Sequence, residues 1–432
     1  MIRFYWRYTF AFCLKQKLYI IASSLISIAI FFFFPKFLPY FKINHTQKIG
    51  IIGKYSSSTL PSDILQLISS GLTAINDDGS VKPGLASSWE KSSDNREYTF
   101  SLKPGIFWHD KKPITAFDIN YNFNDVATSA IDNQTIKFTL KEPFPPFPII
   151  VAKPIFKNGL IGTGNHAVNN IKFNGQIIEK LDLTGNLSFR FYPNEKTAKT
   201  AFQLGELDEI RGISNFDELE KWKNVKITPE INYHQFVAIF LDTQNPKFSS
   251  KSLRQALSYA IKDRWEPTAL GPISPKSWAY NKDVKPYNYD LVNATTLLKK
   301  AVGDDNTAVN EIELSTIPSL LNTAESIKSD WAQLGIEVKI KVIRDFDQGF
   351  EALLISQDIP PDPDQYFLWH STQSGNISHY KSPKVDKLLE EGRKTENQEK
   401  RKEIYFDFQK SLIEDSPAIF LYYPTTYNIS RK

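Results

Sequence analysis

Cysteine is almost absent from this chain, which has a single one, Cys13, among 432 residues. The long part of the chain that follows Cys13 therefore contains no disulfide and no thiolate chemistry. Domains of this size can hold together on their hydrophobic cores alone. The cysteine count is thus compatible with export from the cytoplasm but does not prove it.

Signatures of catalysis and of metal binding are also missing. The six histidines show no HExxH or other close ligand spacing: His45, His109, His166, His234, His370 and His379. There is no G-x-S-x-G nucleophile elbow, and no pair among the 48 acidic residues is singled out for glycosidase chemistry. These absences alone decide little between an enzyme and a binding protein.

Most of the chain lacks an excess of charge of either sign. The formal net charge is +4, but residues 1–42 carry six basic residues and no acidic one. Removing those six charges leaves −2 for the rest. Nucleic-acid binding requires a basic patch or stripe, so we expect no nucleic-acid partner. The length exceeds that of one ordinary domain and predicts two or three lobes.

The N-terminus contains a long uncharged run, Leu18–Phe34, that is broken only by three serines. A helix of this length spans roughly 26 Å, close to the hydrocarbon thickness of a bilayer. Four positive charges precede the run, which predicts a cytoplasmic N-terminus. We expect a cytoplasmic segment (1–17), a transmembrane signal anchor (18–35) and a linker (36–45). A cleaved signal peptide is the competing interpretation, although no small-x-small site follows the run.

Residues 84–126 have the densest local pattern in the chain. Apolar and polar residues alternate over 98–102, which predicts a strand, and Ile106–Trp108 is expected to return as a second one. Thr115 stands at a helix N-cap position, with Asp118 three residues later as a capping-box variant. Each feature alone is typical of an ordinary structural hairpin and helix.

Taken together, the segment resembles the signature of family 5 extracellular solute-binding proteins, the oligopeptide-, dipeptide- and nickel-binding receptors of ABC importers. The matching residues are Leu85, Ala86, Trp89, Glu90, Tyr98, Phe100, Trp108, His109, Asp110, Pro113, Thr115, Ala116 and Asp118. Lys111 stands where the family usually has glycine, a departure that concerns the turn. Together with the missing catalytic motifs, the resemblance predicts a protein that is not an enzyme and needs no cofactor.

The resemblance implies an α/β, periplasmic-binding-protein-like fold with two α/β lobes, a hinge and a third, small lobe. The interval between Val126 and Ile136 is short where relatives carry helices, so we expect the small lobe to be reduced. The predicted divisions are lobe I (46–72, 163–235 and 413–432), the small lobe (73–162) and lobe II (236–412).

Several shorter patterns fit this division. Gly162 and Gly164 are expected to allow a sharp chain crossing, and 233–237 is expected to lie in the hinge. Residues 312–338 read as a strand–helix–strand unit, typical of α/β lobes. The final strand is expected over 419–423.

The candidate ligand contacts are Asp358, Tyr366, Trp369 and Tyr233. Asp358 matches an aspartate that pairs with the α-ammonium group in peptide-binding relatives, and a carboxylate forms strong charge-assisted bonds there. The alternative is an ordinary loop aspartate, with Asp362 and Asp364 as turn residues. Tyr366 and Trp369 could line the pocket or pack in the core.

The function that the resemblance implies is a monomeric binding component of an ABC import system, held at the cell membrane with its main domain outside the cytoplasm. It would capture an oligopeptide between its lobes and deliver it to a permease, and through it to the ATPase subunits. A receptor for a metal chelate or another small solute is one alternative. A sensory or scaffold protein that has lost transport is the other.

Overall fold

The computed structural model describes residues 16, 19, 23, 46–216, 219–262, 264–303, 309–344 and 349–432. The predicted segments 1–17, 18–35 and 36–45 therefore lie outside the described residues, apart from Gln16, Tyr19 and Ser23. In the part of the chain that is described, no helix has the length and apolar character needed to cross a membrane. Residues 48–432 form one unit.

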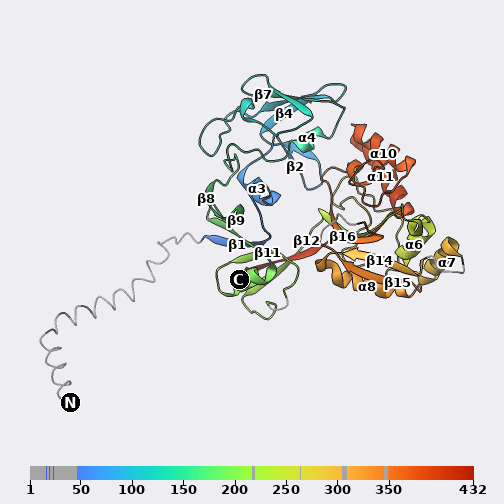
Figure 1. The fold of residues 1–432 in the computed structure, drawn as a ribbon. Coiled ribbons are helices and arrows are strands. Elements are labelled where there is room, and N and C mark those ends of the chain that lie inside the picture. Colours follow the sequence, from blue (N-terminus) through green and yellow to red (C-terminus); the bar gives the residue numbers. More distant parts are fainter. Residues whose placement is uncertain are drawn as a thin grey trace, which may run out of the picture. The chain divides into compact units, whose positions relative to one another are not determined.

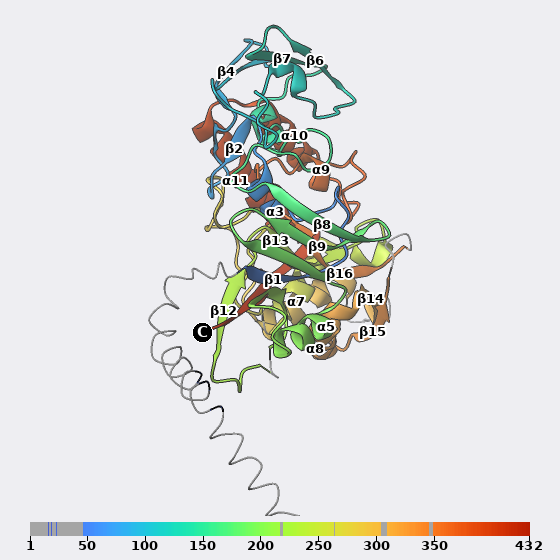
Figure 2. The same ribbon diagram turned by 90° about the vertical axis from the view of Figure 1, so that its left-hand side faces the viewer.

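Lobe I is built on a seven-stranded sheet with the strand order β12-β18-β11-β1-β10-β9-β8 (Figures 1 and 2). β1 and β11 run parallel, whereas β18 is antiparallel to both β11 and β12. Its strands and helices are β1 (Gln47–Ile52), α3 (Ser62–Ile68), β8 (Val168–Asn174), β9 (Ile177–Leu183), β10 (Leu187–Tyr192), α5 (Glu195–Gln203), β11 (Glu209–Ile213), β12 (Val225–Ile231) and β18 (Thr425–Arg431).

The small lobe contains an antiparallel four-stranded sheet, β4-β5-β7-β6, whose apolar face carries a cluster of aromatic rings. Its elements are β2 (Thr73–Ile75), β3 (Val81–Pro83), β4 (Ala86–Lys91), β5 (Glu97–Leu102), η2 (Ala116–Asp118), β6 (Val126–Ala130), β7 (Thr135–Leu140) and α4 (Phe147–Ile150). β6 and β7 form a hairpin, so the interval between Val126 and Ile136 consists of strand β6, a short turn and the start of β7.

Two local expectations for the small lobe were wrong. Residues 106–108 form no strand and contribute only an isolated bridge between Phe107 and Pro113. The expected helix after Thr115 is a single 3₁₀ turn, although the capping box is present, with the Thr115 N–H donating to Asp118 Oδ2 at 2.8 Å. A cap satisfies backbone groups at a helix start but does not supply the packed apolar face that extends a helix.

Lobe II is built on a five-stranded sheet with the order β15-β14-β16-β13-β17. β14 and β15 are parallel and connected by α8, so the predicted strand–helix–strand unit is confirmed. The elements of this lobe are β13 (Gln235–Leu241), η3 (Pro246–Phe248), α6 (Lys251–Tyr259), α7 (Leu291–Val302), β14 (Glu311–Thr316), η5 (Pro318–Leu320), α8 (Leu321–Ala332), β15 (Glu337–Val342), β16 (Ala352–Asp358), α9 (Tyr366–Trp369), α10 (Pro383–Lys394), α11 (Gln398–Asp415) and β17 (Ala418–Tyr422).

Helices cover both faces of the lobe II sheet (Figure 1). Alternate residues of β13 point to opposite faces, as the pleat of a strand requires. Val237 and Ile239 pack with α6, α7 and α8, whereas Phe236 and Phe240 pack with α9, α10 and α11. Because both faces are buried, β13 is an almost continuous apolar run.

Two chain segments cross between the large sheets. One connects β12 to β13 and contains Tyr233, and the other connects β17 to β18 at 423–424. The Asn232 N–H donates to the Pro424 carbonyl at 2.8 Å, which ties the crossings together. The prediction that 413–432 belongs wholly to lobe I is wrong for β17, which pairs with β13 in the lobe II sheet. β18 was not predicted.

The signature turn joins the small lobe to the segment that leads into lobe I. The Gly162 N–H donates to His109 Nδ1 at 3.3 Å, and His109 Nε2 lies 2.9 Å from the Gly164 carbonyl, which accepts its hydrogen. A Cβ atom at Gly164 would lie 2.6 Å from the Leu67 carbonyl oxygen. Close backbone approach therefore requires glycine here.

Candidate functional site

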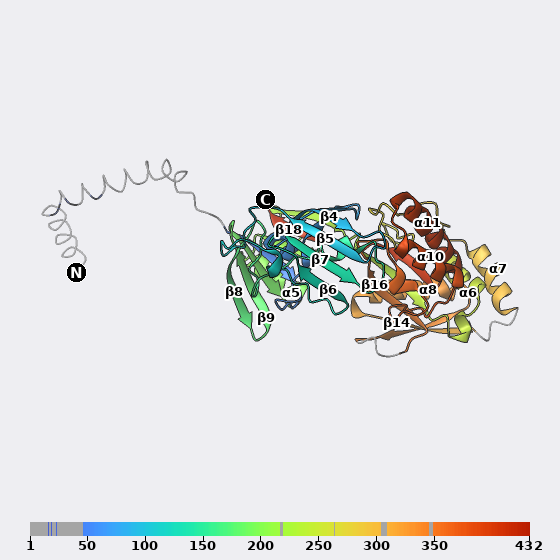
Figure 3. The same cartoon turned by 90° about the horizontal axis from the view of Figure 1, so that it is seen from above.

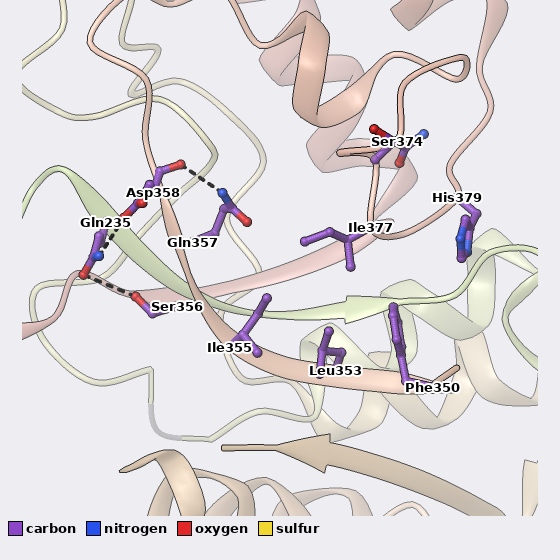
Figure 4. Close-up of a pocket in the computed structure, with 11 residues that line it drawn as sticks. Gln235, Phe350, Leu353, Ile355, Ser356, Gln357, Asp358, Ser374, Ile377 and His379 are labelled. Atoms are coloured by element: carbon purple, nitrogen blue, oxygen red, sulfur yellow. Dashed lines mark hydrogen bonds between the residues drawn. The ribbon is translucent and has the colours of Figure 1, made fainter. Parts of the chain in front are cut away.

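A pocket of about 490 Å³ lies along β16 in lobe II (Figure 4). One wall is formed by β16 with the start of β13, and the other by the loop 374–379. The lining residues are Gln235, Phe350, Leu353, Ile355, Ser356, Gln357, Asp358, Ser374, Asn376, Ile377 and His379. Leu353, Ile355 and Ile377 contribute apolar surface beside the polar lining residues, and pockets of this size commonly hold small-molecule ligands.

Asp358 lies at one end of this pocket, at the last position of β16, with its side chain exposed. The antiparallel register pairs it with Gln235, whose Nε2 donates to Asp358 Oδ1 at 2.6 Å. Because a carboxylate has about four lone-pair sites, this bond leaves acceptor capacity on Asp358. The geometry therefore holds one carboxylate in a defined position where a ligand can reach it.

The other three candidate residues do not line this pocket. Trp369 is 1% exposed and packs in the lobe II core against Phe240, with ring centroids 5.9 Å apart. Of its two roles, the structure supports core packing. Tyr366 is partly buried and stacks on His370 at 4.2 Å.

Tyr233 lies in the crossing between the sheets, where its ring meets Tyr423 edge-on with a centroid distance of 5.2 Å. The ammonium group of Lys276 lies 5.3 Å from the Tyr233 ring centroid, within the range of a cation–π contact. The structure therefore does not bring the four candidates together around one ligand position.

Asp362 and Asp364 hold helices in place and are more than turn residues. Arg401 from α11 forms a buried bidentate ion pair with Asp362 through Nη1, at 2.8 Å, and Nη2. Burial opposes the charge of Arg401, but the bonds and charge of Asp362 raise its pKa above the ordinary arginine value. For Asp364, burial raises the pKa of the carboxyl group. Arg393 from α10 opposes this shift through an ion pair of 3.1 Å.

The small lobe contacts lobe II directly. Glu396, between α10 and α11, forms an ion pair with Lys91 and accepts a hydrogen bond from Asn95 Nδ2. The Arg393 guanidinium lies 5.1 Å from the ring centroid of Phe144 in the small lobe. These contacts, which the sequence did not predict, place α10 and α11 next to the small lobe (Figure 1). Seen from above, the two helices lie on the opposite side of the unit from β8 and β9 (Figure 3).

Two further contacts connect the turn between β2 and β3 with lobe II. The Trp278 N–H donates to the Asp78 carbonyl at 3.2 Å. A Cβ atom at Gly79 would lie 2.7 Å from the carbonyl oxygen of Pro361, so the two backbones nearly touch. The small lobe therefore meets lobe II at two separate places.

Of the residues that line the pocket, the sequence analysis named only Asp358 as a candidate, and Gln235 and His379 are two of those it missed. Gln235 is 123 residues from Asp358 and reaches it only through strand pairing. His379, at the other end of the pocket, pairs its Nδ1 with Asp242 Oδ1 at 2.9 Å. No spacing motif in the sequence marks either residue. Among the described residues, no group of three or more His, Cys, Asp or Glu side chains could hold a metal ion.

Comparison with known proteins agrees with this architecture. The family model described as "Bacterial extracellular solute-binding proteins, family 5 Middle" matches residues 80–167 and 179–379. The match covers well over half of the chain. The chain belongs to family 5 of the bacterial extracellular solute-binding proteins, a family of binding proteins rather than of enzymes, as the sequence predicts.

Individual relatives are distant in sequence. The dipeptide-binding protein of Escherichia coli (strain K12) is 24% identical over 446 aligned residues, covering 82% of each chain. The alignment has more positions than this chain has residues, because it includes gaps. This chain therefore lacks segments that the relative has. Two solved structures share the fold. NikZ from Campylobacter jejuni in complex with Ni(L-His) is 23% identical, with a TM-score of 0.73, and the match covers 90% of this chain and 94% of that one. The oligopeptide-binding protein AppA from Bacillus subtilis in complex with a nonapeptide is 22% identical, with a TM-score of 0.70, and the match covers 89% of this chain and 94% of that one.

Proposed function

We propose that this protein is the substrate-binding component of an ABC import system and captures oligopeptides between lobe I and lobe II for delivery to a permease. Membership of the solute-binding family supports the binding role. The names of the relatives, which include dipeptide- and oligopeptide-binding proteins, favour a peptide as the solute. The observation that carries the proposal is the exposed carboxylate of Asp358 at one end of the lobe II pocket, whose lining is partly apolar.

A peptide suits the chemistry of this pocket. Its α-ammonium group would form a charge-assisted hydrogen bond with Asp358, and such bonds are about twice as strong as neutral ones. Leu353, Ile355 and Ile377 would contact apolar parts of the ligand. A pocket that fixes one charged end and accepts varied side chains elsewhere would bind many different peptides.

Closure would follow from the two crossings. A ligand that touches both lobes only when they approach each other stabilises the closed state by that difference in contacts. The closed unit would then present a distinct surface to the permease. We propose that the protein acts as a monomer.

A thermal-shift screen of the full-length protein in detergent against pools of peptides tests the ligand class. We expect peptides with a free N-terminus to raise the melting temperature and N-acetylated versions to lose most of the effect. The Asp358→Asn variant should bind free peptides about tenfold or more weakly, since a hydrogen bond to a charged group contributes about 1.5–3 kcal/mol. Asp407→Asn, an exposed position on α11 outside the pocket, is the matched control.

The same screen separates the alternatives. A clear shift with a nickel or iron chelate and none with any peptide would replace the peptide by a metal chelate, the kind of ligand that NikZ carries in its structure. No shift with either class would favour a sensory or scaffold role without transport.

We also propose that the uncharged run Leu18–Phe34 anchors the protein in the cell membrane, with the main domain outside the cytoplasm. The length of the run and the positive charges before it support this orientation. The protein should stay in the membrane pellet after alkaline carbonate extraction and keep its full mass. Release of a shortened, soluble form would show that the segment is a cleaved signal peptide.

A further inference from the structure

A second, smaller cavity lies in lobe II, and the proposed function does not use it. Its volume is about 50 Å³, and it lies between the end of α6, the segments 264–270 and 285–288, the end of α11, and β17. β17 is the last strand in the order of the lobe II sheet, and β13 separates it from β16, which lines the larger pocket. The two cavities share no lining residue.

The segment 264–270 forms one wall of this cavity and is fixed to β17. The Ala269 N–H donates to the Leu421 carbonyl at 3.1 Å. Arg264 connects the end of α6 with the same strand, because its Nη1 donates to the Phe420 carbonyl at 2.7 Å and its Nη2 to the Ser258 carbonyl at 2.8 Å. The guanidinium group of Arg264 is therefore held in one position.

The charge of Arg264 has no acidic counterpart in the cavity lining, which contains two cationic side chains, Arg264 and Lys285, and no carboxylate. The acceptors of Arg264 are two carbonyls and the Ser258 hydroxyl, all neutral, and its Nε is buried with no hydrogen-bond partner among the described residues. Glu266 is exposed and accepts hydrogen bonds from Thr268. Burial lowers the pKa of Arg264 from 12.5 to about 10, as expected for a charge that is taken out of water without a counter-ion.

Lys285 brings a second cation to the cavity and is itself held in place. Its ammonium group lies 5.7 Å from the ring centroid of Tyr259 and 5.1 Å from that of Tyr287, within the range of cation–π contacts. It also pairs with Glu414 at 3.1 Å. Because Glu414 pairs with Lys251 at the same distance, one carboxylate is shared between two ammonium groups.

Three donor groups of the lining remain for a ligand. The Arg264 Nε–H has no partner, and the Ser258 hydroxyl accepts from Arg264 at 2.9 Å but keeps its own hydrogen. The Lys285 ammonium group has three hydrogens and one acceptor, Glu414. Several donors with positive charge suit an anion that has more than one oxygen atom. One water needs about 10–15 Å³, so a cavity of about 50 Å³ has room for a small anion and none for a peptide.

We infer that lobe II binds a small inorganic oxyanion, such as phosphate, in this cavity between Arg264 and Lys285, with Ser258 as a third donor. The anion supplies the counter-charge that the buried guanidinium group lacks. It thereby stabilises the packing of the segment 264–270 against β17. This inference does not depend on the proposed peptide function, because the larger pocket is built from other residues.

Titration calorimetry of the full-length protein in detergent with sodium phosphate tests the inference, with the ionic strength kept constant by sodium gluconate. We expect saturable binding of one phosphate per protein and a melting temperature that rises with phosphate concentration. Lys285→Gln should weaken phosphate binding about tenfold or more. Lys282→Gln removes an exposed lysine outside the cavity, three residues earlier in the chain, and as the matched control should bind phosphate like the unchanged protein.

Arg264→Lys is the second variant. It keeps the positive charge but removes the Nε–H donor, so it should also lower the affinity for phosphate, and circular dichroism shows whether it is folded. If it does not fold, the comparison of Lys285→Gln with Lys282→Gln decides.

Three results would overturn the inference. Equal weakening by Lys285→Gln and Lys282→Gln, or a melting temperature that rises without saturation, would show a general effect of charge. Chloride that binds as tightly as phosphate would contradict the selection of an oxyanion. Absence of phosphate binding would remove the site and leave the peptide function as it stands.

Discussion

The backbone at Lys111 has a φ of +64°, within the turn that connects Trp108 to Pro113. In this region the Cβ atom of an L-residue crowds the neighbouring carbonyl, at a cost of roughly 1–2 kcal/mol. Glycine avoids that cost but loses more conformational freedom on folding. The family pattern has glycine at this position, and the structure explains why.

Replacing Lys111 by glycine should therefore stabilise the protein slightly. We expect the free energy of unfolding to rise by up to about 1 kcal/mol, because relief of the backbone strain exceeds the entropy cost of glycine. Urea unfolding followed by circular dichroism measures the change. Lys112→Gly, at the next position, is the control and should destabilise. A lower stability for Lys111→Gly would mean that the lysine side chain makes a compensating contact.

The ion pair between Asp362 and Arg401 is a second individual contact with a large effect, since both side chains are about 9% exposed. Removing one partner of such a pair leaves the other charge buried without compensation. Asp362→Asn should lower the free energy of unfolding by about 3–5 kcal/mol. Asp125→Asn, which breaks the exposed pair with Lys141, should change it by less than about 1 kcal/mol. Similar losses for both variants would contradict the structural role of Asp362.

Among the elements, the turn between α10 and α11 connects lobe II to the small lobe. Glu396 in this turn receives hydrogen bonds from Lys91 and Asn95, which lower the pKa of its carboxyl below the ordinary value of 4.5. A carboxyl whose pKa is lowered in the folded state stabilises that state above its unfolded pKa. The contribution is lost as the pH falls through the lowered value.

Glu396→Gln should thus destabilise the protein at pH 7 and lose this effect in acid. The side chains are about 40% exposed, so solvent screening limits the loss at pH 7 to less than about 1 kcal/mol. Urea unfolding of both proteins between pH 7 and pH 3 should show the two stabilities converging below pH 4.5. The same substitution in a Lys91→Met, Asn95→Ala background is the control and should have no effect. A difference that persists in acid would exclude this contact as its cause.

For the whole molecule, the architecture implies motion about two adjacent crossings. β12 and β18 pair in lobe I, β13 and β17 pair in lobe II, and the chain changes sheet at 232–234 and again at 423–424. Two parallel connections restrict the motion to bending about one region, which suits opening and closing. The contacts of Glu396 and Arg393 with the small lobe would add to the stability of a closed arrangement.

Ligand binding should make the protein measurably more compact if closure accompanies it. We expect the radius of gyration from small-angle scattering to decrease when a saturating peptide is added. Asp358→Asn should require a higher peptide concentration for the same decrease, because the substitution weakens binding and not closure. An unchanged radius at saturation would show that the peptide binds without closing the lobes.

Much of the fold is predictable from short stretches of sequence. The strand–helix–strand unit over 312–338 follows from local periodicity, and the signature around His109 indicates the family. Thr115 shows the limit of such reasoning: its capping box forms, but the helix ends after one turn. β18 shows another limit, because its partners β11 and β12 lie about 200 residues earlier in the chain.

The candidate site was predictable only in part, for the same reason. Asp358 could be proposed from a family pattern, but Gln235 and His379 reach the pocket through strand pairing and loop packing that no local pattern encodes. Tryptophan is an aromatic residue of the kind that often lines ligand pockets, but Trp369 is buried in the core. The amino-acid order sets local conformation and the motifs that mark the family, since these depend on neighbours in the chain. Contacts between distant segments decide which sheet contains β17 and which side chains line the same pocket. These contacts exist only after the lobes have packed.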